Sequence, residues 1–119
     1  MADRRRATGL NGEDAVAEWY RASGYEIVDR NWRVREGEID VIAQRAGEVV
    51  FCEVKTRRSD AFGVPAEAVT PRKQQRLRLL ARHWLAGSDA RPRALRFDVA
   101  SVTPTDAGGW KVDVLEAAF

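Results

Sequence analysis

Residues 37–57 read GEIDVIAQRAGEVVFCEVKTR, and this stretch decides the fold. Apolar and polar residues alternate from Glu38 to Ala43, and the run from Val49 to Thr56 is apolar at most positions, so both runs predict β-strands. The short polar connection between them contains Gly47, which indicates a hairpin. The second strand is apolar on both faces, as is typical of a central strand in a covered sheet.

Charged residues interrupt these apolar strands. Strict alternation groups Glu38, Asp40 and Ile42 on one face of the first strand and Ile39, Val41 and Ala43 on the other. In the second strand it groups Val49, Phe51, Glu53 and Lys55 opposite Val50, Cys52 and Val54. Antiparallel pairing about the hairpin then brings Asp40 near Glu53 and Lys55.

Neighbouring carboxylates in an apolar setting need a counter-charge. Removing one unpaired carboxylate from water costs several kcal/mol, and two of them repel each other. A ligand set made of oxygen atoms suits a hard ion such as Mg²⁺, and Lys55 would stabilise charge developing on a phosphate. The pattern therefore favours phosphodiester hydrolysis. The alternative is a Glu53–Lys55 ion pair at a sheet edge, with Asp40 solvated at a strand end.

A third carboxylate lies on a predicted helix from Leu10 to Ala22, which Ser23 and Gly24 close. Glu13 shares a face with the apolar positions Val16, Ala17 and Tyr20. We therefore expect it to point inward, as a further metal or water ligand. The alternative is that Glu13 only complements the helix dipole, a role that Asp14 fills equally well.

A second helix is predicted from the cap Thr70 and the first-turn proline Pro71 to about Ala86. Lys73 lies four residues before Leu77 and thus on the inward side, near the start of this helix. Two interpretations are open. Lys73 reaches the site or a phosphate, or its side chain extends outward along the edge of the core.

Three segments together resemble a known family: the early helix with Gly12 and Glu13, GEID at 37–40, and EVKTR at 53–57. They are similar to the YraN-like family of small bacterial proteins, which is assigned to the PD-(D/E)XK nuclease superfamily and resembles the archaeal Holliday-junction resolvases. The resemblance extends from about Leu10 to RFDV at 96–99. Ile39 occupies the position of the proline in the superfamily's name.

The resemblance implies a role for each matching residue. Asp40 and Glu53 would be ligands of Mg²⁺ or Mn²⁺, Lys55 the catalytic lysine, and Glu13 the helix carboxylate beside the metal. It also implies a restriction-endonuclease-like fold. Glu38 faces the same way as Asp40 and is interpreted either as an acid that supports the ligands or as a turn residue only.

Composition predicts one compact domain. The chain has 119 residues and a net charge of +2, and no apolar run approaches a membrane span or a secretory signal, so we expect a cytoplasmic protein. A basic arm at 1–8 would precede the domain at 9–119. The only cysteine, Cys52, is predicted to be a core residue, and the sole histidine, His83, argues against histidine-based triads and zinc sites.

The other predicted strands are Tyr25–Asp29, Leu95–Val102 and Trp110–Leu115. With the two helices they give the order helix, strands, helix, strands. This order predicts an α/β sandwich in which a mixed β-sheet is flanked by helices.

Cations surround the proposed acidic centre. Arg57 and Arg58 directly follow the E-x-K strand, and with Lys73 they are the predicted contacts to a nucleic-acid backbone. The loop from Arg58 to Pro65, which includes Phe62, is a candidate to close over a substrate. Further arginines form the N-terminal arm and the outer side of the second helix, namely Arg4, Arg5, Arg6, Arg72, Arg76, Arg78 and Arg82. The alternative is compositional, since a GC-rich genome favours arginine over lysine.

The sequence thus predicts a metal-dependent endonuclease that acts on nucleic acid, with DNA, and branched DNA in particular, as the favoured substrate. Two other classes stay open. One is a nucleic-acid-binding module that keeps the nuclease fold without catalysis, and the other is a protein-interaction scaffold in which the acids and Lys55 form a structural ion network. A homodimer is compatible with each of them.

Overall fold

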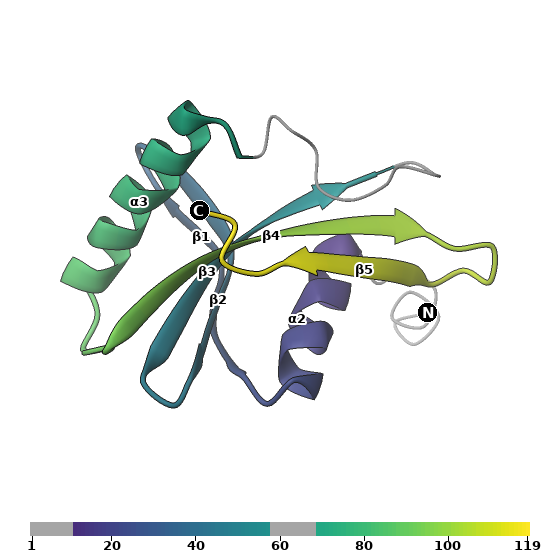
Figure 1. The fold of residues 1–119 in the computed structure, drawn as a ribbon, viewed down its shortest axis with the longest axis horizontal. Helices are drawn as coiled ribbons and strands as arrows, with labels where there is room; N and C mark the ends of the chain where they lie inside the picture. Colours follow the sequence, from purple (N-terminus) through teal and green to yellow (C-terminus); the bar gives the residue numbers. More distant parts are fainter. Residues whose placement is uncertain (1–10, 58–68) are drawn as a thin grey trace.

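The computed structural model describes residues 11–57 and 69–119, which form two helices and five strands (Figure 1). Their order is α2 (Gly12–Ala22), β1 (Glu26–Val34), β2 (Gly37–Arg45), β3 (Glu48–Thr56), α3 (Pro71–Ala86), β4 (Ala94–Pro104) and β5 (Trp110–Leu115). The predicted basic arm, Arg58, and the loop with Phe62 lie outside the described residues.

The five strands form one mixed sheet in the order β1-β2-β3-β4-β5. Strands β3 and β4 are parallel and are connected through α3, whereas the other neighbours are antiparallel. The prediction that the 49–56 strand is central is confirmed. The first strand is longer than predicted, since it continues past Asp29 to Val34.

Each face of the sheet packs against one helix (Figure 1). The α2 side contains Val16 and Tyr20 of the helix together with Val41, Val50 and other strand residues. The α3 side contains Leu77, Leu80 and Trp84 with Ile39, Phe51 and Phe97. The predicted α/β architecture is confirmed, and it is consistent with a restriction-endonuclease-like fold. Within the described ranges, neither helix is long and apolar enough to span a membrane.

Both helices begin with the capping residues that their sequences favour. The Asn11 side chain accepts a hydrogen bond from the Asp14 N–H at 2.9 Å, and the Asp14 carboxylate accepts one from the Asn11 N–H at 3.1 Å. In α3, Thr70 caps the helix and Pro71 occupies its first turn. Because Asp14 completes the cap of α2, Glu13 is left available for another role.

The alternation predicted for β2 is wrong at its centre. Ile39 and Ile42 both pack on the α3 side, whereas Val41 and Ala43 pack on the α2 side. The reason lies at Asp40, where the ladder with β1 is interrupted: Asn31, the residue opposite, has a positive φ of 50° and is not paired with it. This irregularity shifts the alternation of β2 by one residue.

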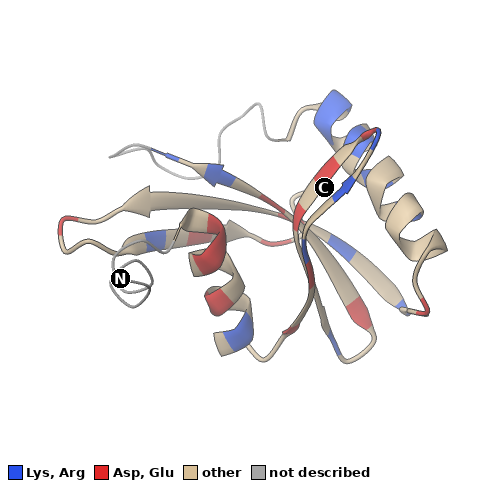
Figure 2. Ribbon diagram, turned by 180° about the vertical axis from the view of Figure 1, so that it is seen from behind, with Lys and Arg blue, Asp and Glu red and all other residues tan. Residues whose placement is uncertain are grey.

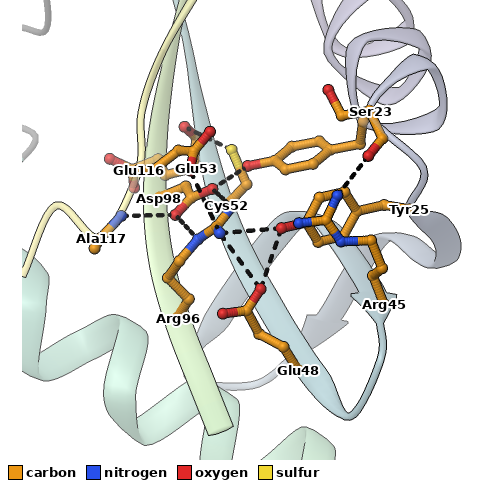
Figure 3. Close-up of polar contacts among 11 residues, drawn as sticks. Ser23, Tyr25, Arg45, Glu48, Cys52, Glu53, Arg96, Asp98, Glu116 and Ala117 are labelled. Atoms are coloured by element: carbon orange, nitrogen blue, oxygen red, sulfur yellow. Dashed lines mark hydrogen bonds and ion pairs between the residues drawn. The ribbon is translucent and has the colours of Figure 1, made fainter.

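A buried ion pair connects the sheet, α2 and the C-terminal segment (Figure 3). Asp98 of β4 is 0% exposed and accepts two hydrogen bonds from Arg96, each at 2.9 Å. The Tyr20 hydroxyl at 2.6 Å and the Ala117 N–H at 3.0 Å donate to the same carboxylate. Such a fully hydrogen-bonded pair is the form in which a fold tolerates buried charge.

Gly12 lets the first turn of α2 approach the sheet closely, and so it helps to place Glu13. A Cβ at residue 12 would lie 2.5 Å from Val102 Cγ2, a contact that requires movement of the helix or of β4. We expect Gly12→Ala to lower the free energy of unfolding by about 1–3 kcal/mol, as is usual for overpacking. Urea denaturation measures this change.

Gly87→Ala is the matched control, because a Cβ there meets only ordinary contacts at 3.9 Å and 4.0 Å. A Gly12→Ala protein as stable as the control would show that the close packing of α2 on β4 is incorrect.

Candidate functional site

Three carboxylates from two elements converge near the start of β2. Oxygen atoms of Glu13, Glu38 and Asp40 all lie within 4.8 Å of one another. Glu13 comes from the first turn of α2, and the other two come from β2. Figure 2 shows the acidic residues in the first turns of α2. Convergence of Glu13 with Asp40 is what the sequence predicted.

Asp40 occupies the point where β2 and β3 separate. The pairs between these strands run as far as Val41 with Cys52. Beyond that pair, the Val54 N–H donates a hydrogen bond to Asp40 Oδ2 at 2.7 Å. The side chain thus replaces a ladder partner, and it fixes the carboxylate between the two diverging strands.

The surroundings of Asp40 disfavour its charged form. The pKa of this carboxyl is raised to about 6, mainly by burial. The hydrogen bond from Val54 opposes this rise, and the nearby negative charges of Glu13, Glu38 and Glu53 contribute to it. A nearby cation would stabilise the ionised form of this carboxylate. Raised pKa values of this kind are more common at functional sites than elsewhere.

Glu53 lies beside the cluster but is held by two lysines. Its carboxylate oxygens are 3.8 Å from Lys55 Nζ and 3.9 Å from Lys73 Nζ. The Glu53 side chain is 14% exposed, and its Oε2 atom is buried without a hydrogen-bond partner in the described part of the chain. Glu53 therefore has charge compensation but incomplete hydrogen bonding, which leaves an acceptor available.

The structure divides the predicted site residues into two groups. Glu13 and Asp40 join Glu38, for which only a supporting or turn role was predicted. Glu53 lies with the lysines rather than among the three clustered oxygens. Lys73 reaches Glu53, so the interpretation in which it extends away from the site is wrong. The backbone N–H of Arg57 donates a hydrogen bond to Val102 O at 2.7 Å. Arg58 lies outside the described residues.

The cluster has a basic neighbour that the sequence patterns did not predict. Arg33 of β1 lies 3.3 Å from Glu38, with its side chain 71% exposed. The two residues are direct partners in the β1–β2 ladder. This contact could have been predicted from the hairpin register, by pairing residues outward from the polar turn at 35–36.

The donor set fits a divalent cation. Three carboxylate oxygens within 4.8 Å form a hard ligand group of the kind that Mg²⁺ and Mn²⁺ accept. Burial and the neighbouring acids disfavour the ionised form of Asp40, and a bound cation would favour it. Glu53, with one unpartnered buried oxygen, would be the nearest additional donor.

Two other reactive residue types take no part in the site. Cys52 is fully buried in the α2-side core, and burial raises the pKa of its thiol, which makes it unreactive, as predicted. His83 is exposed on α3 and lies 4.0 Å from Glu36.

Comparison with known proteins gives a consistent result. Residues 12–102 match the profile of a family described as "Uncharacterised protein family UPF0102". A UPF0102 protein from Nocardia farcinica is 50% identical over 97% of this chain and 91% of its own length. A relative from Symbiobacterium thermophilum is 49% identical over 96% of this chain and 97% of its own length.

The variant Asp40→Asn tests whether the negative charge of Asp40 lowers the stability of the folded protein. The variant keeps an acceptor for the Val54 N–H but removes the negative charge. The folded-state pKa of about 6 exceeds the ordinary value of 3.8, so the penalty of ionised Asp40 is small at low pH and grows as the pH rises through 6. In metal-free protein, the stability gain of the variant over wild type should be about 1–2 kcal/mol larger at about pH 7.5 than at about pH 4.5.

Urea denaturation at the two pH values measures this gain. Asp113→Asn serves as the control, because it removes the same charge from β5, where the carboxylate lies 4.0 Å from Lys111 and is not one of the clustered acids. A stability gain for Asp40→Asn that is equal at both pH values would contradict the raised pKa of Asp40 in the folded protein.

Lys73→Met tests the electrostatic coupling between Glu53 and the cluster. The variant removes one of the two cations on Glu53, which leaves the region more negative. We expect Mn²⁺ to bind roughly three- to tenfold more tightly, while Lys73→Arg stays close to wild type. Calorimetric titration measures both affinities, and unchanged or weaker Mn²⁺ binding in Lys73→Met would show that Lys73 is not coupled to the cluster.

Proposed function

The chain belongs to the uncharacterised protein family UPF0102, the YraN-like family, and we propose that it is a divalent-metal-dependent endonuclease that hydrolyses phosphodiester bonds of nucleic acid. The proposal includes membership of the PD-(D/E)XK nuclease superfamily, with DNA as the favoured substrate. The observation that carries it is the convergence of Glu13, Glu38 and Asp40 beside the pair of Glu53 and Lys55.

The contrast with the buried pair on β4 supports a functional role. Asp98 receives four hydrogen bonds, two of them from Arg96, so this charge is fully compensated by the fold. Within the described residues Asp40 accepts one hydrogen bond, and its pKa is raised by burial and by the neighbouring acids. The fold compensates one buried acid completely and crowds other acids together, and a cation-binding role of the crowded acids explains this difference best.

The carboxylates would hold the metal ion, with Glu13 supplied by α2 and Glu38 and Asp40 supplied by β2. A bound Mg²⁺ or Mn²⁺ would polarise a phosphoryl oxygen and lower the pKa of a water molecule. Lys55 has a different role. It lies on the strand next to the acids, with its ammonium group 3.8 Å from Glu53, and it would stabilise the negative charge that develops on a phosphate.

Glu53 and Lys73 position this cation. Lys73 shares the charge of Glu53, so Lys55 is not required as its sole partner and can turn toward a phosphate. The Oε2 atom of Glu53 that lacks a hydrogen bond is available to a water molecule or to a metal-bound ligand. The two lysines and Glu53 thus form the cationic side of a site whose acidic side is the cluster.

Cleavage and Mn²⁺ binding test the function together. We expect wild-type protein with Mn²⁺ to cleave DNA, tested on branched, duplex and single-stranded substrates. Lys55→Met should cleave at least about 100-fold more slowly, because it removes a group that stabilises the transition state, while its Mn²⁺ affinity stays within about threefold. Asp40→Asn should lose both Mn²⁺ binding and cleavage.

Lys111→Met is the matched control, since Lys111 lies on β5 beside Asp113 and far from the cluster in the sheet order. It should behave like wild type. Mn²⁺ binding without cleavage of any substrate would favour a catalytically silent binding module. Absence of both Mn²⁺ and nucleic-acid binding would favour a scaffold with a structural ion network, and either result would overturn the proposed activity.

A further inference from the structure

The charge distribution of helix α3 does not stabilise the helix itself. It carries five cations and no acidic residue over Pro71–Ala86, namely Arg72, Lys73, Arg76, Arg78 and Arg82. The positive end of the helix dipole lies at its N-terminus, so Arg72 and Lys73 in the first turn are unfavourable there. Arg72 and Arg76 are also four residues apart, a spacing at which like charges destabilise a helix.

Helix α2 shows the opposite arrangement. Its first turn carries Glu13 and Asp14, and its last turn carries Arg21, as the dipole favours. In Figure 2 the first turns of α2 are acidic, whereas the basic residues of α3 gather toward its N-terminal end. Average composition does not explain why the two helices differ in this way. The cations of α3 therefore indicate an anionic partner at this helix.

The cations of α3 have different surroundings. Arg78 lies over the rings of Phe97 and Phe119, at 5.2 Å and 5.4 Å from their centroids, and so contributes to packing. Lys73 reaches Glu53 in the site. Arg72 and Arg76 are exposed, and within residues 11–57 and 69–119 neither of them forms an ion pair.

Arg76 lies close to the start of β2, the strand that carries two residues of the acidic cluster. A Cβ built on Gly37 would lie 3.8 Å from Arg76 Cδ, so the arginine stem lies over the start of β2, one residue before Glu38. At the same end of α3, Lys73 Nζ is 3.9 Å from Glu53. The N-terminal half of α3 therefore carries cations close to residues of the proposed site, and Arg72 lies one helical turn before Arg76 on the same face of the helix.

We propose that Arg72 and Arg76 bind consecutive phosphates of a double-helical nucleic acid and hold its backbone across the acidic cluster. This inference rests on the proposed function and adds to it the binding surface and the duplex form of the substrate. Guanidinium groups recognise phosphate through paired hydrogen bonds, and backbone contacts of this kind carry no sequence preference.

The side chains around the site favour a duplex over a single strand. Proteins that bind single strands stack bases on exposed aromatic rings. Among the described residues, the exposed large hydrophobic side chains are Leu95 and Leu115, and no aromatic side chain is exposed. Charge without a stacking surface is typical of contact to the backbone of a duplex.

Fluorescence anisotropy with metal-free protein tests this surface without cleavage. The probes are a DNA duplex of about 20 base pairs and a single strand of the same length, titrated at several salt concentrations. The double variant Arg72→Gln/Arg76→Gln should bind the duplex at least about tenfold more weakly, with a salt slope lower by about 1.8, because about 0.9 is lost per phosphate contact. Its thermal stability should be unchanged or higher, since repulsion in α3 is relieved.

The control is Arg21→Gln/Lys111→Gln, which removes the same charge at the end of α2 and on β5 and should bind within about twofold of wild type. Equal duplex binding by the α3 variant and the control, or tighter binding of the single strand by wild type, would overturn this proposal. DNA cleavage by the α3 variant at the wild-type rate in the same experiment would leave the proposed activity intact. Failure of wild type to bind either probe and to cleave would overturn both.

Discussion

The hydrogen bond from the Val54 N–H to Asp40 Oδ2 is the constraint on which the site depends. From Val41 to Arg45, β2 pairs regularly with β3. Before Val41 the two strands separate. Asp40 supplies the acceptor that the missing ladder would have provided, so its carboxylate is fixed in a partly buried position instead of rotating into water. Glu13 and Glu38 then have a rigid partner, and three oxygens converge on one place.

The inward-facing acidic side chains of the described residues have two kinds of surroundings. On β4, Asp98 is compensated by Arg96, Tyr20 and a backbone N–H, and this cluster connects α2 and the C-terminal segment to the sheet. Near the start of β2, like charges are crowded instead, with Glu53 between two lysines at one side. The first arrangement stabilises the fold. The second crowds like charges together, which lowers the stability of the folded protein, and the proposed metal ion would offset this cost.

Local patterns predicted most of this structure. Capping residues and apolar spacing gave both helices, and apolar runs gave the five strands and the central place of β3. The pairing of Glu13 with Asp40 followed from helix periodicity and strand order. What failed was the alternation through Asp40, because Asn31 interrupts the ladder through a backbone angle that no period-2 pattern contains. The roles of Glu38 and Lys73 depended on tertiary contacts between elements, and spacing along one strand or helix does not encode such contacts.

Diffraction from a crystal soaked in Mn²⁺ tests the convergence of the three carboxylates most directly. The anomalous signal of manganese locates the ion without reference to activity. We expect one strong anomalous peak bounded by Glu13, Glu38 and Asp40, with the Val54 N–H still on Asp40. A map at saturating Mn²⁺ that has no peak between these side chains, or that has peaks only at isolated surface acids, would contradict the metal site and the chemistry built on it.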